Sequence, residues 1–230
     1  MSSGCRNGQG RFTAQNGDTI FFTRRETGRR NGVGFVTSRE LTSSVIGYNP
    51  VNDRIVTIRL RCHSLNTTLI QVYAPTSEAS EEEMQDFYDV VQQTLDNVPR
   101  RDVIIVMGDW NAKVGKSITN SSRVGQHGLG ERNQRGQDLV DLCFTNNLDI
   151  GNIIFQHHPR RLYTWTSPGD RFRNQIDYIM IQGRWRSALK NARTRPGADC
   201  ESNHQLLCAT IKILMRSRRK QTKTTRYDVT

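Results

Sequence analysis

The segment that most clearly carries chemistry is an apolar run that ends in a carboxylate and an amide. Residues 103–107 (VIIVM) are all apolar, and Gly108, Asp109, Trp110 and Asn111 follow them. Such a run fits a strand buried on both faces, and polar groups after a strand lie at the carboxyl edge of a sheet, where α/β folds place their ligands. Asp109 could therefore hold a metal ion or activate a water molecule, and Asn111 could orient what Asp109 holds.

Composition limits the function classes. The 230 residues suffice for one domain with a sizeable core. Lys and Arg number 33 against 22 Asp and Glu, and this net charge of +11 predicts a polyanionic partner, with DNA as the leading candidate. We expect no membrane segment, because no apolar stretch approaches about 20 residues, and no small-molecule cofactor. The five scattered cysteines lack Cys-x-x-Cys spacing, which favours a reduced, intracellular protein, nuclear or cytoplasmic.

Alternating strand-like and helix-like segments must position the chemical groups. A capping box at Ser80 and Glu83, with apolar residues at helical spacing after it, predicts a helix leading to the 103–107 strand. A shorter helix is predicted over Gln134–Thr145, and the glycines Gly125, Gly128 and Gly130 indicate a mobile surface loop. Strand-like segments lie at 19–22, 33–37, 54–60, 68–73, 153–155, 162–166, 175–181 and 206–214, and the segments 54–60 and 68–73 are expected to pair as a hairpin.

The domain organisation predicted from these segments has three parts. Residues 1–18 are expected to be irregular, residues 19–214 to form one domain, and residues 215–230 to form a basic tail that serves as a linker or a nucleic-acid-binding arm. The oligomeric state is left open.

Four short segments, taken together, resemble a known family. They are VYAP (72–75), GDWNAKVG (108–115), YTWTS with NQIDYI (163–167 and 174–179) and SNH (202–204). In order and spacing they resemble the endonuclease/exonuclease/phosphatase superfamily, and within it the endonuclease domains of BovB/RTE-type LINE retrotransposons and craniofacial development protein 2-like proteins. The resemblance implies an α/β fold, a four-layer sandwich of two mixed sheets flanked by helices, with a divalent-metal-dependent phosphodiesterase site at one sheet edge.

The resemblance also implies roles for individual residues. Asp109 matches the aspartate that activates the attacking water, and Asn111 the asparagine that orients the water or the phosphate. Tyr73 matches a tyrosine that contacts the scissile phosphate. Asp177 matches the aspartate behind the catalytic histidine, and His204 matches that histidine. Asn133 matches a polar group on the substrate strand.

Two departures from the family pattern predict an impaired metal site for Mg²⁺ or Mn²⁺. The expected ligands are Asp109 and Asn203, and Asn203 stands where the family motif Ser-Asp-His has its aspartate, so one negative charge is absent. The family's first strands, which supply a glutamate ligand, have no counterpart in residues 1–18, so the resemblance implies a domain that lacks them. Glu26 is the one candidate replacement, although four arginines nearby favour an ion-pair role for it.

A basic and aromatic stretch before Asp177 is the predicted DNA-binding surface. Aromatic residues at alternate strand positions more often pack on a sheet than stack on bases, but paired arginines precede these, which favours a DNA edge. The predicted DNA-binding residues are Arg160, Arg161, Tyr163, Trp165, Arg173 and Asn174.

Three functions are compatible with the sequence. The first is a LINE-retrotransposon-derived DNA endonuclease that nicks one strand with magnesium to leave a 5′ phosphate and a 3′ hydroxyl, impaired in this copy. The alternative is a catalytically inactive nucleic-acid-binding module of the same fold. The third, a phosphatase or other phosphodiesterase, is disfavoured by the basic charge and the LINE-like segments.

Overall fold

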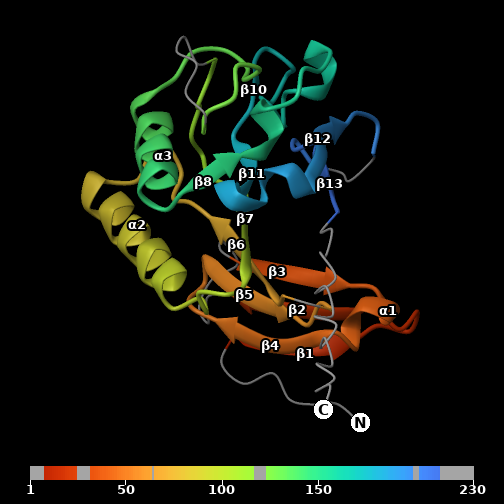
Figure 1. Ribbon diagram of the computed structural model, residues 1–230. Helices are drawn as coiled ribbons and strands as arrows, with labels where there is room; N and C mark the ends of the chain where they lie inside the picture. Colours follow the sequence, from red (N-terminus) through yellow and green to blue (C-terminus); the bar gives the residue numbers. More distant parts are fainter. Residues whose placement is uncertain (1–7, 25–31, 64, 117–122, 199–201, 213–230) are drawn as a thin grey trace, which may run out of the picture.

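The centre of the molecule is a six-stranded sheet with the order β4-β5-β6-β7-β11-β8 (Figure 1). The structure is a computed structural model and describes residues 8–24, 32–63, 65–116, 123–198 and 202–212. Strands β6 and β7 are parallel, and every other neighbouring pair in this sheet is antiparallel. The strands are β4 (Val45–Pro50), β5 (Ile55–Leu60), β6 (Thr67–Tyr73), β7 (Val103–Asp109), β8 (Leu148–Ile150) and β11 (Asp177–Gln182).

Two amphipathic helices, α2 (Glu81–Asp96) and α3 (Gln134–Thr145), cover one face of this sheet (Figure 1). Ile104 and Val106 of β7 point to this face and join the helix side chains in one core cluster. Helix α2 begins where predicted, because the Ser80 hydroxyl accepts a hydrogen bond from the Glu83 N–H at 3.1 Å. Among the described helices, none combines the length and the apolar character needed to cross a membrane.

Two smaller sheets cover the opposite face. One is antiparallel and contains β1 (Gln9–Thr13), β2 (Thr19–Arg24) and β3 (Gly32–Thr37); the other pairs β12 (Leu189–Arg195) with β13 (Leu206–Ile211). The residues of β7 that alternate with the helix-facing ones, Val103 and Ile105, belong to the cluster on this side. Burial on both faces explains why residues 103–107 are continuously apolar, and the predicted α/β sandwich is confirmed.

Short elements complete the described part of the chain. Helix α1 (Arg39–Thr42) joins β3 to β4, and strands β9 (Trp165–Thr166) and β10 (Arg173–Asn174) form a two-stranded ribbon. Short 3₁₀ helices are present at η1 (Gly151–Ile153), η2 (Pro159–Arg161) and η3 (Gly183–Ala188).

Both predicted helices and the hairpin of β5 and β6 are confirmed, whereas three local predictions are wrong. Residues 9–13 form β1 by pairing with β2, although their composition indicates irregular structure. Residues 151–153 form η1, and the strand in this region is β8 instead. Of the predicted strand 162–166, only two residues pair. Strands β4 and β12 were not predicted: β12 (LKNARTR) carries many polar residues, and β4 (VIGYNP) contains Gly47 and Pro50, which interrupt the pattern of a strand. Residues 1–7 and the tail from 213 onward lie outside the described residues.

The glycines after β7 also differ from the prediction of a mobile surface loop. A Cβ atom on Gly125 would lie 1.9 Å from the Ile153 carbonyl oxygen, and one on Gly128 would lie 2.0 Å from the Gly115 carbonyl oxygen. These glycines permit close backbone packing, and Val124 beside them is buried. The segment 123–130 is therefore packed against the rest of the domain.

We expect Gly108→Ala to destabilise the fold severely. Gly108 has φ +145°, and a Cβ atom would lie 1.9 Å from the Val72 carbonyl oxygen on the neighbouring strand. The clash with backbone should cost about 3 kcal/mol or more of the free energy of unfolding, measured by chemical denaturation. Gly169→Ala is the matched control: Gly169 also has positive φ, +82°, but open space around it, so this change should cost only about 1 kcal/mol. Equal losses for the two variants would contradict the close-approach explanation.

Candidate active site

Three adjacent strand ends bring the predicted polar residues to one edge of the sheet. Tyr73 ends β6 and pairs in register with Asp109, which ends β7. Asp177 begins β11 and pairs with Asp109 from the other side. Because β6 is parallel and β11 antiparallel to β7, the carboxyl ends of two strands and the amino end of the third meet there.

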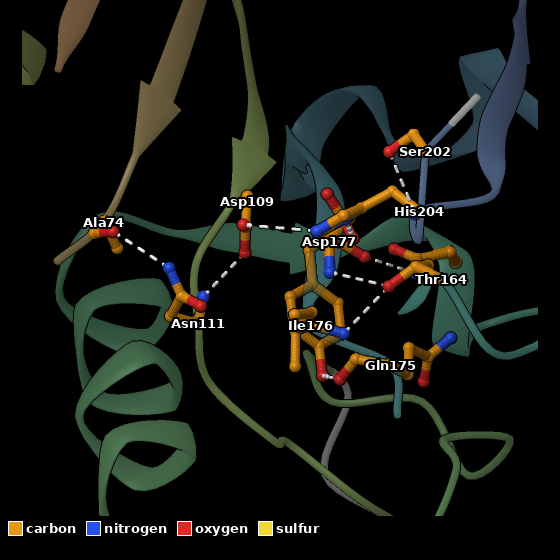
Figure 2. Close-up of polar contacts among 11 residues, drawn as sticks. Ala74, Asp109, Asn111, Thr164, Gln175, Ile176, Asp177, Ser202 and His204 are labelled. Carbon is orange, nitrogen blue, oxygen red and sulfur yellow. Dashed lines mark hydrogen bonds and ion pairs between the residues drawn. The ribbon is translucent and has the colours of Figure 1, made fainter. Parts of the chain in front are cut away.

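The turn after β7 fixes the Asp109 carboxylate. Oδ1 of Asp109 accepts a hydrogen bond from the Asn111 backbone N–H at 2.9 Å, and the Asn111 amide donates to the Ala74 carbonyl at 2.9 Å. Asn111 has φ 48°, a left-handed conformation that asparagine tolerates better than most residues. Asn111 thus ties the turn to the chain that leaves β6, and Figure 2 shows it on the opposite side of Asp109 from His204.

His204 completes the cluster from a distant part of the sequence (Figure 2). Its Nδ1 lies 3.0 Å from Oδ2 of Asp177, and its Nε2 lies 3.9 Å from Oδ2 of Asp109. Backbone bridging to Trp165 holds His204 in place. The hydroxyl of Thr164 accepts hydrogen bonds from the backbone N–H groups of Ile176 at 2.9 Å and Asp177 at 3.0 Å. One segment, 164–166, therefore positions both the histidine and the aspartate behind it.

The surroundings of Asp109 and His204 shift the pKa values of both side chains. Burial and the nearby Asp177 carboxylate raise the pKa of Asp109 to about 6, while the Asn111 N–H and His204 act in the opposite direction. The hydrogen bond to Asp177 raises the pKa of His204 and outweighs its burial. Two carboxylates and one imidazole share a small space, which suits chemistry on a phosphate ester because the imidazolium can meet negative charge and Asp109 can accept a proton.

The sequence matches the model of the Endonuclease/Exonuclease/phosphatase family over residues 5–204. The chain belongs to this family. It is also 45% identical over 197 residues to craniofacial development protein 2 of Tragulus javanicus and to that of Bos taurus. These alignments cover 86% of this chain but 34% and 33% of the two relatives, so the chain spans about a third of their length.

Solved structures share the fold. The endonuclease domain of TRAS1, a telomere-specific non-LTR retrotransposon, superposes with a TM-score of 0.60 at 17% identity, covering 85% of this chain and 87% of that one. The 3′-5′ exonuclease NExo from Neisseria meningitidis gives 0.60 at 18% identity, covering 86% and 80%. The AP endonuclease LMAP from Leishmania major gives 0.66 at 13% identity, covering 86% and 72%.

Family members generally depend on a divalent metal ion, and some of the donor atoms at this edge of the sheet are suited to binding such an ion. One ligand atom each from Asp109, Asp177 and His204 lies within 4.8 Å of the others. Carboxylate oxygens are the ligands that Mg²⁺ and Mn²⁺ prefer, but the Asp177 oxygen nearest His204 is already engaged by Nδ1. Asn203 is exposed, and its backbone carbonyl accepts a hydrogen bond from the Thr166 backbone N–H at 2.9 Å. Glu26 lies outside the described residues.

The predicted DNA-binding residues lie on the segment that leads to Asp177. Arg160 and Arg161 are exposed in η2, and Trp165 and Asn174 pair across the β9–β10 ribbon. Arg173 is paired with Asp170 at 2.8 Å, and its guanidinium lies 5.0 Å from the centre of the Tyr163 ring. Arg173 and Tyr163 are thus already in contact with one another.

The remaining predicted residues are held by structural contacts. Arg54 lies over the Tyr73 ring, 5.5 Å from its centre. Asn133 caps α3: its side-chain oxygen accepts the N–H groups of Gly136 and Lys113 at 2.9 and 3.0 Å, and these contacts account for the residue structurally. Sequence reasoning did not single out Thr164 or the exposed Phe172 at the end of the ribbon, although Thr164 lies within the YTWTS segment.

We expect Asp109→Asn to stabilise the fold above pH 6. A carboxyl whose folded-state pKa is raised stabilises at low pH, and this contribution is lost as pH rises through the folded pKa of about 6. Asn keeps the oxygen that accepts the Asn111 N–H but carries no charge. At pH 8 in EDTA the gain should be on the order of 1–3 kcal/mol, and it should shrink toward pH 5. Thermal melts across this range are the measurement, with Glu131→Gln, an exposed residue, as control. A pH-independent difference would refute the electrostatic explanation.

Proposed function

We propose that this chain is the DNA endonuclease domain of a LINE-retrotransposon-derived protein, a divalent-metal-dependent phosphodiester hydrolase. The observation that carries the proposal is the contact of His204 with Asp177 at 3.0 Å and with Asp109 at 3.9 Å, at the edge where Tyr73, Asp109 and Asp177 are in register. A histidine oriented by one carboxylate and facing another can serve phosphate-ester chemistry. The family membership and the nuclease neighbours support the same class.

Each residue has a distinct role in the proposed reaction. Asp109 accepts the proton of the attacking water, and the Asn111 N–H holds its carboxylate in position. Asp177 fixes the tautomer of His204 and favours the imidazolium, whose Nε2 side faces the phosphate and stabilises charge in the transition state. Tyr73 lies beside Asp109 and contacts the phosphate, and the products are a 5′ phosphate and a 3′ hydroxyl.

Mg²⁺ or Mn²⁺ would be held by Asp109 with Asn203. When bound, the metal polarises the phosphate and stabilises the leaving oxygen. Asn203 offers a neutral oxygen where the family motif has a carboxylate, and Asp177 is engaged by His204. We infer that metal binding is weak and that hydrolysis by this chain is impaired.

A second function, a nucleic-acid-binding module without catalysis, is favoured by the exposed basic and aromatic groups near the site. Arg160, Arg161 and Phe172 are exposed, with Phe172 at 68%. Cationic groups for the phosphate backbone and an aromatic ring for a base would bind DNA whether or not the carboxylates act. One neighbouring structure, the NExo 3′ phosphatase, was solved with a product DNA hairpin.

We expect Asn203→Asp to raise Mg²⁺-dependent nicking of supercoiled plasmid by about tenfold or more over the unsubstituted chain, because it returns a negative charge to the metal site. Adding Asp109→Ala or His204→Ala to this variant should reduce nicking to background while DNA binding is kept, since both act on the transition state. If the unsubstituted chain already nicks plasmid robustly and as fast as the Asn203→Asp variant, the proposal of impaired hydrolysis is wrong. If Asp109→Ala leaves nicking unchanged, the site assignment is wrong.

We expect duplex DNA binding to weaken steeply with salt and to depend on the paired arginines of η2. Arg160→Ala with Arg161→Ala should weaken binding and reduce the slope of log affinity against log salt by about 2, since each phosphate contact contributes about 0.9. Arg100→Ala with Arg101→Ala is the matched control, an exposed pair just before the opposite end of β7. Fluorescence anisotropy between 50 and 300 mM salt measures both. An equal change in affinity and salt slope for the Arg100→Ala, Arg101→Ala variant would contradict a DNA-binding surface at η2.

A further inference from the structure

Helices α2 and α3 carry a charge opposite to that of the rest of the chain. Together they contain eight acidic residues and one basic residue, Arg135, a balance of 1 − 8 = −7. The rest of the chain has 33 − 1 = 32 basic and 22 − 8 = 14 acidic residues, a balance of +18. The eight acidic residues are Glu81, Glu82, Glu83, Asp86, Asp89, Asp96, Asp138 and Asp141. Such a surface repels the phosphate backbone that the rest of the protein attracts.

A groove of about 1000 Å³ lies between the two helices. Its lining includes the apolar groups of Met84, Tyr88 and Leu142, with Asp89 and Asp141 contributed by α2 and α3. Figure 1 shows both helices on the side of the central sheet away from β1–β3, with no element of the described chain drawn over them. We call this feature the α2–α3 groove.

The acidic side chains of the groove are ordered but not neutralised. Asp89, Asp138 and Asp141 accept hydrogen bonds from the amides of Gln85, Gln134 and Gln137 at 2.9, 3.0 and 2.7 Å, each four residues away on the same helix. These donors are uncharged. Within the described ranges, no Lys or Arg forms an ion pair with any of these three carboxylates.

Arg135, the one basic residue of the two helices, also lines the groove, but its guanidinium is engaged by backbone carbonyls at one end. Its guanidinium donates hydrogen bonds to the backbone carbonyls of Pro75, Thr76 and Ala79, which precede α2. These bonds join α3 to the chain that enters α2 and hold the groove open at this end. At the other end Gln92 and Asn146 exchange two side-chain hydrogen bonds, of 2.9 and 2.7 Å. Both ends of the groove are thus braced by polar contacts between the helices.

Tyr88 lines the groove, and its hydroxyl is shielded from solvent without a hydrogen-bond partner among the described groups. The Tyr88 ring also stacks on Trp110, with ring centres 6.3 Å apart, so an aromatic contact connects the groove to the turn that follows β7.

We propose that the α2–α3 groove is the docking site for a basic, Lys- and Arg-rich peptide segment of a partner protein. The apolar lining suits the aliphatic stems of these side chains, and the unneutralised carboxylates suit their charged ends. The proposal does not depend on catalysis at Asp109. The negative charge of the two helices repels DNA. A partner bound in the groove therefore leaves the basic remainder of the chain free to bind nucleic acid.

The test uses a fluorescein-labelled 12-residue peptide with six Lys or Arg residues separated by Gly and Ser, at 150 mM salt. We expect Asp89→Asn with Asp141→Asn to weaken its binding by about tenfold, because Asn keeps the glutamine contact and removes the charge. Glu40→Gln with Glu131→Gln, two exposed residues outside the groove, changes the net charge equally and should alter binding less than about twofold. Equal weakening by both pairs, or no binding at 150 mM salt, would overturn the proposal.

A second readout locates the peptide. In a chain with Trp165→Phe and Trp185→Phe, Trp110 is the remaining tryptophan, fully buried and stacked on Tyr88. Peptide binding should change the fluorescence of Trp110. In the variant with Asp89→Asn and Asp141→Asn, the peptide concentration at the midpoint of this change should rise by the same factor by which binding of the labelled peptide weakens. Binding without any fluorescence change would place the peptide elsewhere. If the peptide binds only after Arg216, Arg218, Arg219 and Lys220 are replaced by Ser, the chain's own basic segment is the occupant and the proposed partner is wrong.

Discussion

The close approach of β6 and β7 at Gly108 is the constraint on which the site depends. Because the backbone of Val72 occupies the space where a Cβ atom would lie, the two strands stay in register to their ends. That register sets Tyr73 beside Asp109, and the antiparallel partner β11 sets Asp177 on the other side. The carboxylates thus come together through main-chain pairing, which is rigid, rather than through loops.

The same geometry places two carboxylates close together at a partly buried site. Asp109 is mostly buried and faces a second carboxylate, so its charged form is disfavoured, and the neighbouring His204 relieves this only in part. Sites that act on phosphate esters commonly hold charges that their own fold does not neutralise, because substrate or metal completes the balance. In the proposed metal site, Asn203 would offer a neutral oxygen in place of a carboxylate, and less acidic charge would be available for that balance.

Helices α2 and α3 differ from the rest of the chain in the sign of their charge. In a chain of net charge +11, the two helices contain eight acidic residues and one basic residue. The helices must bury an apolar stripe on the sheet, but nothing in that packing requires their outer faces to be acidic. The outer faces are therefore free to be selected for solubility or for a partner, whereas the inner faces are fixed by the core.

The sequence alone determined the local elements and the chemical types at the site. Periodicity and capping defined α2, α3 and the buried β7, since these signals are local. The polar strands β1 and β12 could not be predicted, because pairing with a neighbouring strand, and not a local apolar pattern, makes them strands. The contact of His204 with Asp177, across 27 residues, and the groove between α2 and α3 were decided by tertiary structure, because distances between remote segments follow from sheet register and helix packing, which no local pattern encodes.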